Sequence, residues 1–450
     1  MLFWKLHKVP ILLALTSVLF YFGFAYDIER TDYLTFITLY SGLFFLFYKL
    51  IQLRKYDIQF LTWTAFIFRA IFILAIPNLS QDFYRFIWDG RLLLESTNPY
   101  LFTVDSFIHI GEFPVDQAAE LHSGMGSLNS GHYSNYPPFN QLCFAIAGLF
   151  AGKSILGSVI VMRLLIIAAD FGTLYFGKKL LKKLDLPTHA IFWYILNPFI
   201  IIELTGNIHF EGVMIFFLVW SLYLLQTGKW KLSAIVFALS VSTKLIPLIF
   251  LPLLIQKLGW KRSLMFFGIV GFVTLALFFP FYSEVFISNY WETIGLWFTN
   301  FEFNASIYYV AREIGYNFRG WNEIAIIGKY TALFVLSLVL LIAIFRKNKT
   351  LPQLITGMLL VLSFYYFTST TVHPWYIATL LILSVFTNYK FPLVWSFVII
   401  LSYLAYIDLG NANKSENLLI IGFEYVIVYG VFIWELFKIK SKRLKKSSKI

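Results

Sequence analysis

Long apolar runs recur along the whole chain, and they constrain its fold more than any other feature. An α-helix needs about 20 apolar residues to cross the hydrocarbon core of a bilayer, and many runs here approach or exceed about 18. The chain is 59% hydrophobic and 13% charged, whereas soluble domains have roughly 25% charged residues. One soluble core could not cover its 50 Phe and 27 Tyr. The sequence therefore predicts an all-α polytopic membrane protein.

The apolar runs also predict how often the chain crosses the bilayer. Runs long enough to cross lie near 9–26, 33–51, 60–77, 155–176, 188–204, 211–227, 263–281, 326–345, 352–369, 373–387, 390–408 and 417–437. The shorter run 138–151 is expected to be re-entrant, because about 10–14 apolar residues cross poorly. The run 233–256 contains Lys244 and two prolines, and we expect a broken helix that returns to its starting side. We predict about 12 crossings within one integral domain, 1–450.

The basic residues predict which side each loop faces. They gather in 178–183, 256–262, 345–349 and the tail 438–450. Such clusters are typical of cytoplasmic loops that face anionic lipid, so the net charge of +12 does not predict a nucleic-acid partner. We expect both termini in the cytoplasm, with the apolar N-terminal run retained as a first span rather than cleaved as a signal peptide.

Three polar segments then fall on the outer side of an inner membrane. They are the small acidic loop 27–32 and two long external loops, 78–137 and 282–325.

The first long loop begins with SQDFYRFIWDGRLLLESTNPY at 80–100, where charges follow directly on an apolar run. On a helix, Asp89 falls about 20° from Asp82 and Arg85 lies within about 60°. The segment is therefore expected to be an amphipathic helix at the outer interface. Its polar face is either part of a site or simply an interfacial anchor that meets water.

Four further clusters of polar and aromatic residues lie at the same predicted side. They are Tyr136 in YPPFNQ, Glu203, Asn207, His209 and Glu211 in ELTGNIHFEG, Lys244 in STKLIPLIF, and His373, Trp375 and Tyr376 in VHPWY. Ionisable groups and broken helices at membrane depth usually line a polar cavity.

Each cluster also has a structural explanation. Lys244 could snorkel to the interface, and the two histidines could be packing or capping residues. Trp375 and Tyr376 suit an interfacial aromatic belt. Arg163 and Asp170, two turns apart in one run, are expected to form a structural pair.

An outward pocket with a lysine, arginines and carboxylates suits an anionic, lipid-linked substrate. The lysine would bind phosphate as a point charge. A carboxylate would take the proton of an attacking hydroxyl.

These segments, in this order, resemble the GT-C superfamily of glycosyltransferases that use polyprenyl-phosphate sugars, and in particular its bacterial mannosyltransferase-like members. The resemblance covers about 60–380 and is strongest at 81–100. It implies an inverting hexosyltransferase of the cell envelope that moves mannose or another hexose to a glycan or lipid acceptor outside the membrane.

The resemblance also implies roles for individual residues. Asp82 would be the general base, with Asp89 as second choice, and Lys244 with Arg85 or Arg319 would hold the donor phosphate. The other predicted substrate-binding residues are Trp88, Tyr136, His209, Glu211, His373, Trp375 and Tyr376. No metal or other cofactor is expected, because the short acidic pair of several GT-C branches is absent and cations can neutralise a single phosphate.

Two other functions stay open from the sequence. A flippase or carrier of a lipid-linked saccharide would show internal repeats, which are not evident here. An oligosaccharide polymerase or ligase would use arginines in a late external loop, and Arg312 and Arg319 occupy that position.

Overall fold

The protein is described from a computed structural model that covers residues 2–406 and 416–447. In this part of the chain, helices form almost all of the regular structure, and one isolated β-bridge joins Phe303 and Thr371. Seven helices are long and apolar enough to cross a membrane. They are α1 (Leu2–Tyr26), α2 (Tyr33–Arg54), α8 (Ile155–Lys183), α14 (Trp260–Phe278), α17 (Ile324–Phe345), α18 (Leu351–Thr368) and α21 (Leu418–Ser447). The chain is thus a helical, multi-pass membrane protein.

The other predicted crossings fall on shorter or bent elements. Among them are α3 (Ile58–Ile71), α11 (Glu211–Gln226), α19 (Ile377–Val385) and α20 (Phe391–Val398). The segments predicted to be re-entrant or broken also contain short apolar helices, α7 (Pro138–Ala151) and α12 (Trp230–Thr243). Helical segments η1 (Thr188–Ile191) and α9 (Phe192–Ile195) meet α10 (Pro198–Ile200) and the π-helix η2 (Ile201–Gly206) at a bend of 51°. If that bent pair is one span, the described residues contain up to eight. The expected count of twelve is not confirmed and stays a prediction.

The helix break predicted at Lys244 is confirmed. Helix α12 ends at Thr243, and Lys244 has an extended backbone with φ −147° and ψ 137°. The 3₁₀ helix η3 (Ile246–Leu254) follows and leads into α13 (Ile255–Leu258). Pro247 and Pro252 cannot donate α-helical hydrogen bonds, which explains why the apolar sequence does not continue as an α-helix. The break leaves a lysine at a helix end beside apolar surface.

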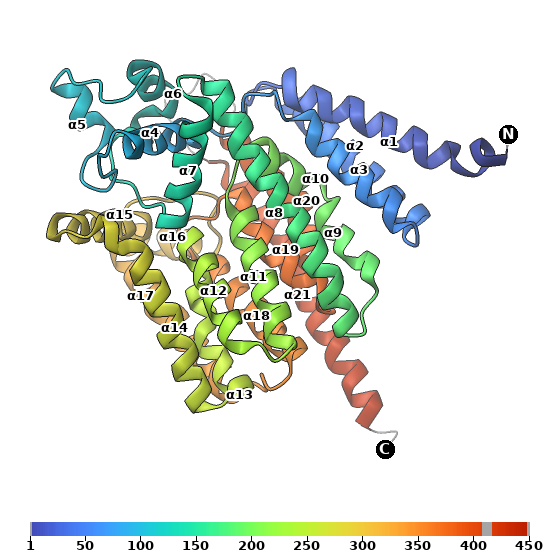
Figure 1. Ribbon diagram of the computed structural model, residues 1–450. Coiled ribbons are helices and arrows are strands. Elements are labelled where there is room, and N and C mark those ends of the chain that lie inside the picture. Colours follow the sequence, from blue (N-terminus) through green and yellow to red (C-terminus); the bar gives the residue numbers. More distant parts are fainter. Residues whose placement is uncertain (1, 407–415, 448–450) are drawn as a thin grey trace.

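The two long polar segments pack against each other at one end of the bundle. The first contains α4 (Asp82–Leu94), α5 (Val104–His109) and α6 (Ala118–Ser130), and the second contains α15 (Glu284–Thr299) and α16 (Ile307–Arg319). The ring of Tyr100 packs against Phe286 and Tyr290, and the Asn289 amide donates to the Tyr100 carbonyl at 3.0 Å. Figure 1 shows these elements at the opposite end from α13 and the C-terminus.

Further short helical segments join the longer elements. They are the 3₁₀ helices η4 (Phe279–Phe281), η5 (Pro374–Tyr376) and η6 (Ile399–Tyr406).

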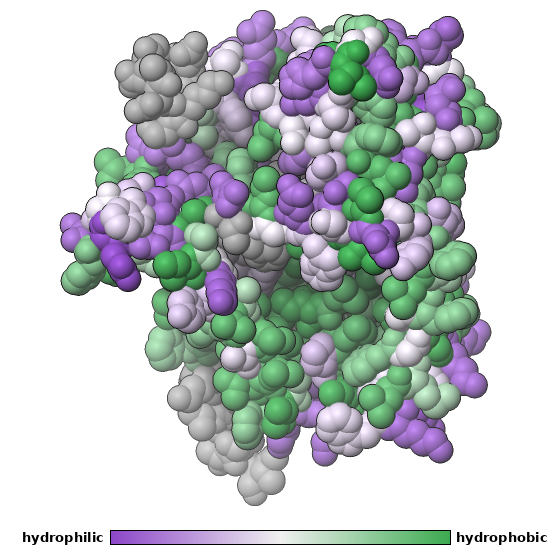
Figure 2. Space-filling model, turned by 90° about the vertical axis from the view of Figure 1, so that its left-hand side faces the viewer, coloured by the Kyte–Doolittle hydropathy of each residue, from purple (hydrophilic) through white to green (hydrophobic). Residues whose placement is uncertain are grey.

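The outer surface divides into a polar end and an apolar body. Figure 2 shows hydrophilic residues over the upper part of one face and hydrophobic residues below. The exposed large hydrophobic side chains include Phe272 and Leu275 of α14, and Leu333 and Leu340 of α17. Apolar surface of this extent suits hydrocarbon rather than water.

Buried arginines tie the helices together inside this body. Arg69 of α3 donates to the Asp170 carboxylate of α8 at 2.7 Å and to the Ile195 carbonyl at 2.7 Å. The expected pairing of Arg163 with Asp170 is therefore wrong. Arg163 instead donates to the carbonyls of Thr205 and Gly206, at 2.9 and 2.8 Å. These carbonyls lie at the end of the π-helix, where intrahelical partners run out, so Arg163 satisfies them.

We expect removal of one partner of the Arg69–Asp170 pair to destabilise the fold strongly. Both side chains are fully buried, so Asp170→Asn would leave a buried guanidinium uncompensated at a cost of about 3–5 kcal/mol. Thermal unfolding in detergent would measure the loss. The double variant Arg69→Met with Asp170→Leu should lose less than either single variant, because no unpaired charge remains.

The matched control is Asp116→Asn. Asp116 pairs with Lys153 at 3.1 Å, but both side chains are at least half exposed, and exposed pairs contribute little. Equal unfolding temperatures for Asp170→Asn and Asp116→Asn would contradict a stabilising role for the buried pair.

Candidate active site

Helix α4 is held tightly against α7, which determines where its charged face points. A Cβ on Gly90 would lie 2.2 Å from the Phe144 carbonyl oxygen, and one on Gly148 would lie 2.9 Å from Leu94. At Gly90 only glycine allows this approach, because the neighbouring atom is backbone, whereas at Gly148 the Leu94 side chain could shift. The rings of Phe86 and Phe144 stack between the two helices at 4.6 Å. The helix is thus embedded in protein, with its polar side toward the loop that follows α6.

Arg85 and Asp89 pair with each other on that side. Their side chains are buried and meet at 2.7 Å. Arg85 also donates to the carbonyls of Asn129 and His132, at 2.7 and 2.9 Å. The Arg85 guanidinium is thus occupied by bonds within the protein and is not predicted to bind a ligand.

The Asp89 carboxylate is likewise occupied by bonds within the protein. Besides Arg85, it accepts hydrogen bonds from Ser134 at 2.5 Å and Gln141 at 3.0 Å. A carboxylate with three such donors is well placed to anchor the loop and poorly placed to exchange protons with a substrate.

Asp82, at the first turn of α4, has a different environment. Its side chain is half-buried, and the Asn129 amide donates to Oδ1 at 3.2 Å. The pKa of the carboxyl is raised, chiefly by burial and also by the charge of Glu211. The Asn129 hydrogen bond and the charges of Lys244 and Arg30 act in the opposite direction and lower it. These groups come from four separate parts of the chain, so the fold gathers charges around Asp82.

Lys244, at the end of the broken helix, is one of the charges that lower the pKa of this carboxyl. Its Nζ forms an ion pair with Glu211 at 2.7 Å, and its side chain keeps 25% exposure against 4% for Glu211. Nζ also lies 5.9 Å from the centre of the Tyr136 ring, close to the limit of a cation–π contact. Lys244, Glu211 and Tyr136 were predicted together, and the structure brings them together.

An aromatic stack forms a further wall. Trp375 lies between the rings of His209, at 3.7 Å, and His373, at 4.6 Å. Burial, followed by the Lys244 charge, lowers the pKa of His209 and lowers that of His373 to about 3. Both imidazoles are therefore neutral at pH 7. Tyr376 contacts His373 edge-on at 5.4 Å.

Two predicted residues lie apart from these contacts. Trp88 is buried and packs on Phe107 at 6.3 Å. Arg319 ends α16 with its side chain 65% exposed, and its Nε lies 3.9 Å from Glu323.

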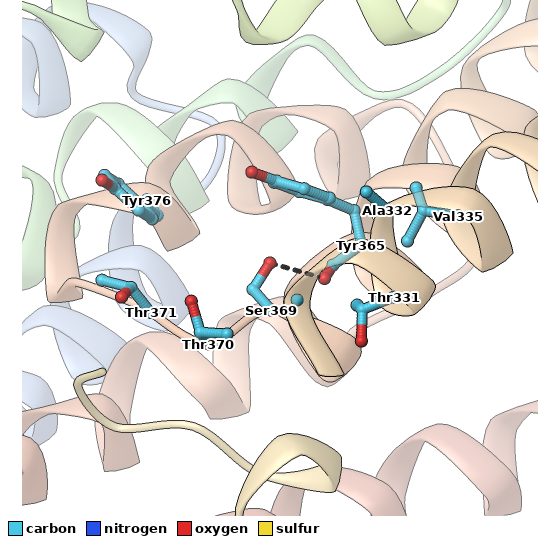
Figure 3. A pocket seen from close by; sticks show the side chains of 9 residues that line it. Thr331, Ala332, Val335, Tyr365, Ser369, Thr370, Thr371 and Tyr376 are labelled. Carbon is cyan, nitrogen blue, oxygen red and sulfur yellow. Dashed lines mark hydrogen bonds between the residues drawn. The ribbon is translucent and has the colours of Figure 1, made fainter. Parts of the chain in front are cut away.

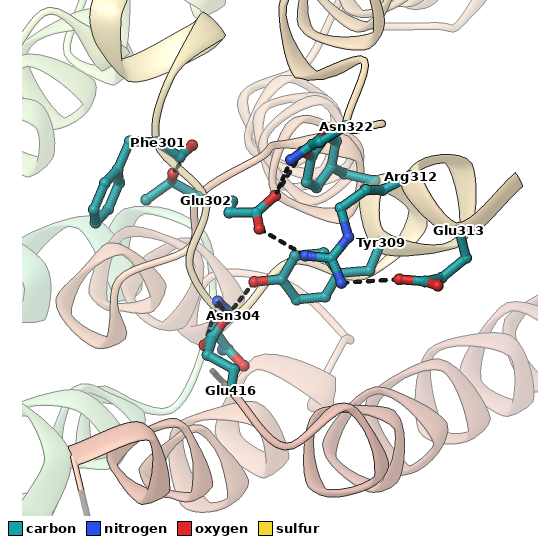
Figure 4. Close-up of polar contacts among 10 residues, drawn as sticks. Phe301, Glu302, Asn304, Tyr309, Arg312, Glu313, Asn322 and Glu416 are labelled. Atoms are coloured by element: carbon teal, nitrogen blue, oxygen red, sulfur yellow. Dashed lines mark hydrogen bonds and ion pairs between the residues drawn. The ribbon is translucent and has the colours of Figure 1, made fainter. Parts of the chain in front are cut away.

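Arg312, the other arginine of the second long loop, is held by carboxylates. It pairs with Glu302 at 2.6 Å and Glu313 at 3.0 Å, and its guanidinium covers the Tyr309 ring at 4.4 Å. Figure 4 shows these groups converging, with Tyr309 also donating to Glu416.

Sequence reasoning missed Arg30. This residue lies in the loop between α1 and α2, and its guanidinium carbon sits 3.0 Å from the centre of the Tyr406 ring. Arg30 is the sole cation of the acidic loop 27–32, and this is the one feature of the sequence that could have identified it. An open recess of about 290 Å³ adjoins it, lined by Arg30, Pro77, Asn78, Leu79, Ser80, Gln81, Phe83, Tyr84 and Gly124.

A smaller pocket of about 60 Å³ lies between α17, α18 and the segment before η5. Most of the residues that line it carry a hydroxyl group, among them Thr331, Tyr365, Thr370 and Tyr376 (Figure 3), although the pocket surface is mainly apolar. Through Tyr376 it adjoins the aromatic stack.

Known proteins resemble the part of the chain that carries most of this site. The family described as alpha-(1->6)-mannopyranosyltransferase, N-terminal domain, matches residues 16–258. That span contains Arg30, Asp82, Glu211 and Lys244.

A curated relative is alpha-(1->6)-mannopyranosyltransferase A of Mycobacterium tuberculosis, with 23% identity over 202 residues. The alignment spans 45% of this chain and 37% of the relative.

The family match covers more than half of the sequence, and it includes the helix that begins at Asp82 and the break at Lys244. The chain therefore belongs to the alpha-(1->6)-mannopyranosyltransferase family, within the GT-C-like mannosyltransferases.

Proposed function

We propose that the protein is a membrane glycosyltransferase that moves a hexose, mannose by family membership, from a polyprenyl-phosphate donor to a glycan or lipid acceptor. The observation that carries the proposal is the convergence of a half-buried carboxylate, Asp82, with a lysine–glutamate pair, Lys244 and Glu211. The site would face the outside of the cytoplasmic membrane, opposite the basic loops.

The reaction is a single displacement at C1 of the sugar. Asp82 takes the proton of the acceptor hydroxyl, and the hydroxyl oxygen forms the new bond to C1. The bond from C1 to the phosphate oxygen breaks, and its electron pair leaves with the polyprenyl phosphate. The anomeric configuration is inverted because attack and departure occur on opposite faces.

Lys244 would stabilise the departing phosphate. It lies at the end of a broken helix next to the apolar η3 segment, so a lipid-linked phosphate can reach it from the bilayer side. Glu211 holds the ammonium in place before the donor arrives. Stabilisation of developing charge by a positioned cation is commonly among the largest contributions to catalysis.

The surroundings of Arg312 favour this proposal over a polymerase or ligase. Such an enzyme would need free arginines in the second long loop for a diphosphate. Arg312 already faces two carboxylates, Glu302 and Glu313, and stacks on Tyr309. An anionic substrate would have to break two ion pairs to use Arg312, against one at Lys244. Arg319 is not held in this way, since its side chain is 65% exposed.

Asp82→Asn should reduce glycosyl transfer at least about a hundredfold, because general-base help contributes about 10²–10⁴ in rate. The assay incubates purified protein with polyprenyl-phosphate sugars and a panel of glycan and lipid acceptors, and measures product and released polyprenyl phosphate. The change keeps the shape of the side chain and its contact with Asn129, so expression and unfolding temperature should match the wild type.

Asp105→Asn is the matched control. Asp105 lies in the same loop, but it pairs with His122 at 2.7 Å and is partly exposed, so transfer should be unaffected. Near-normal turnover by Asp82→Asn would remove Asp82 as the base. Movement of the lipid-linked sugar across liposomes with no bond formed would instead support a carrier.

The pH dependence of transfer should report the environment of Asp82. The base acts deprotonated, so kcat/KM falls as pH drops through its pKa, which burial raises above the ordinary value near 3.9. Lys244→Met removes a charge that lowers this pKa, and the acidic limb should move to higher pH. Glu211→Gln removes a charge that raises it, and the limb should move to lower pH.

Profiles of kcat/KM against pH for the two variants check these opposite shifts. They are informative even if both variants have lower rates, because the position of the limb is independent of its height. Shifts in the same direction would show that the titrating group is not Asp82.

A further inference from the structure

Arg30 is brought to the site by contacts that fix the loop between α1 and α2. The Asn78 amide donates to the carbonyls of Phe24 and Ile28, at 2.9 and 2.8 Å. Asn78 lies four residues before Asp82, so these bonds tie the loop to the start of α4. The charge of Arg30 accordingly lowers the pKa of Asp82.

The Arg30 guanidinium is held in place by an aromatic ring and still has an N–H group that could bind a ligand. One face covers the Tyr406 ring, with Tyr403 farther away at 5.9 Å. Within the part of the chain that the structure describes, its buried Nε has no hydrogen-bond partner. A buried polar atom without a partner is costly. The arrangement is therefore suited to a ligand that supplies an acceptor oxygen.

The recess beside Arg30 is polar, and its lining includes the sequence neighbours of the proposed base but not Asp82 itself. The residues on both sides of Asp82, Gln81 and Phe83, line it together with Tyr84. Gln81 donates to the Met125 carbonyl at 2.8 Å, which fixes its amide at the rim. A recess of about 290 Å³ is near the lower end of the range of about 300–1,000 Å³ typical of small-molecule sites. Its size fits a sugar residue better than a lipid.

The two cations whose charges act on Asp82, Lys244 and Arg30, lie in different parts of the structure. Lys244 ends a helix within the apolar body, whereas Arg30 lies in a polar loop between two long helices. We propose that the recess beside Arg30 binds the sugar residue of the acceptor, with the guanidinium and the Gln81 amide contacting its hydroxyl oxygens. This inference rests on the proposed function and assigns one cation to each substrate.

The recess chemistry favours a sugar over the donor phosphate. A guanidinium binds phosphate oxygens at least as readily as hydroxyl groups, so the preference rests on its neutral neighbours: Gln81 and Tyr84 contribute an amide and a phenol, which suit hydroxyl groups. The donor phosphate already has a cation in Lys244, next to apolar surface that its lipid tail requires.

The test compares steady-state kinetics of wild type, Arg30→Gln and Glu29→Gln in purified, detergent-solubilised full chain. Glu29 is the exposed neighbour of Arg30 in the same loop and serves as the matched control. Arg30→Gln should raise KM for the acceptor at least about tenfold, since hydrogen bonds from a charged group are stronger than neutral ones. KM for the polyprenyl-phosphate donor should stay within about twofold, and Glu29→Gln should change neither.

A second measurement separates this inference from the proposed function. Binding of an alpha-(1->6)-linked mannose trisaccharide is titrated by calorimetry without donor, and should be weakened at least about tenfold by Arg30→Gln. If wild type transfers no sugar, the proposed reaction fails, and the titration alone decides the recess. An unchanged acceptor KM with equal trisaccharide binding, or a raised donor KM instead, would overturn the assignment. Unfolding temperatures identify any variant whose fold is damaged, and Arg30→Lys then replaces it with the same expected direction.

Discussion

The buried pair of Arg85 and Asp89 is the interaction on which the geometry of the site depends. A buried charge is tolerated when it is paired and hydrogen-bonded, and this pair achieves both by binding the segment between α6 and α7. Arg85 fixes the carbonyl of Asn129, whose amide in turn holds Asp82. Asp89 fixes Ser134 and Gln141 on either side of Tyr136, the residue that faces Lys244. The buried pair therefore helps to position the proposed base through Asn129, and it fixes the segment that carries Tyr136 beside Lys244.

Helical periodicity predicted part of this arrangement and could not predict the rest. It placed Asp82, Arg85 and Asp89 on one face of a helix, and the structure agrees. Periodicity indicates which side chains share a face, but it carries no information on what covers that face. Here α7 and the preceding segment cover two of the three residues because Gly90 and Gly148 allow close packing. Asp82 stays available because it lies at the first turn, beyond the packed region.

The same limit explains the other differences from expectation. Prolines disrupt a helix at their own position, so the break at Lys244 could be predicted from the sequence. Arg163 and Asp170 lie on one helix, yet their partners are a π-helix end and an arginine of α3, which no local pattern reveals. Arg30 is distant in sequence from all other site residues, and long-range contacts, including the hydrogen bonds of Asn78 and the stacking on Tyr406, bring it to them. Several apolar runs fold as short, bent or 3₁₀ segments, so the length of a run alone does not decide whether it crosses the membrane.

The charges of the side chains around Asp82 determine which of them can bind a charged substrate. The two histidines of the site are neutral at pH 7, because burial and the neighbouring lysine disfavour their protonation. They therefore contribute shape and stacking around Trp375 rather than charge. Lys244 and Arg30 are the cations that influence Asp82, and Glu211 offsets the first of them. An arriving phosphate must compete with Glu211 for Lys244, so donor binding would weaken the Lys244–Glu211 contact. Arg30 forms no ion pair among the described residues, and its guanidinium stacks on Tyr406. The donor phosphate therefore has to displace a carboxylate at Lys244, whereas the proposed acceptor sugar has no carboxylate to displace at Arg30.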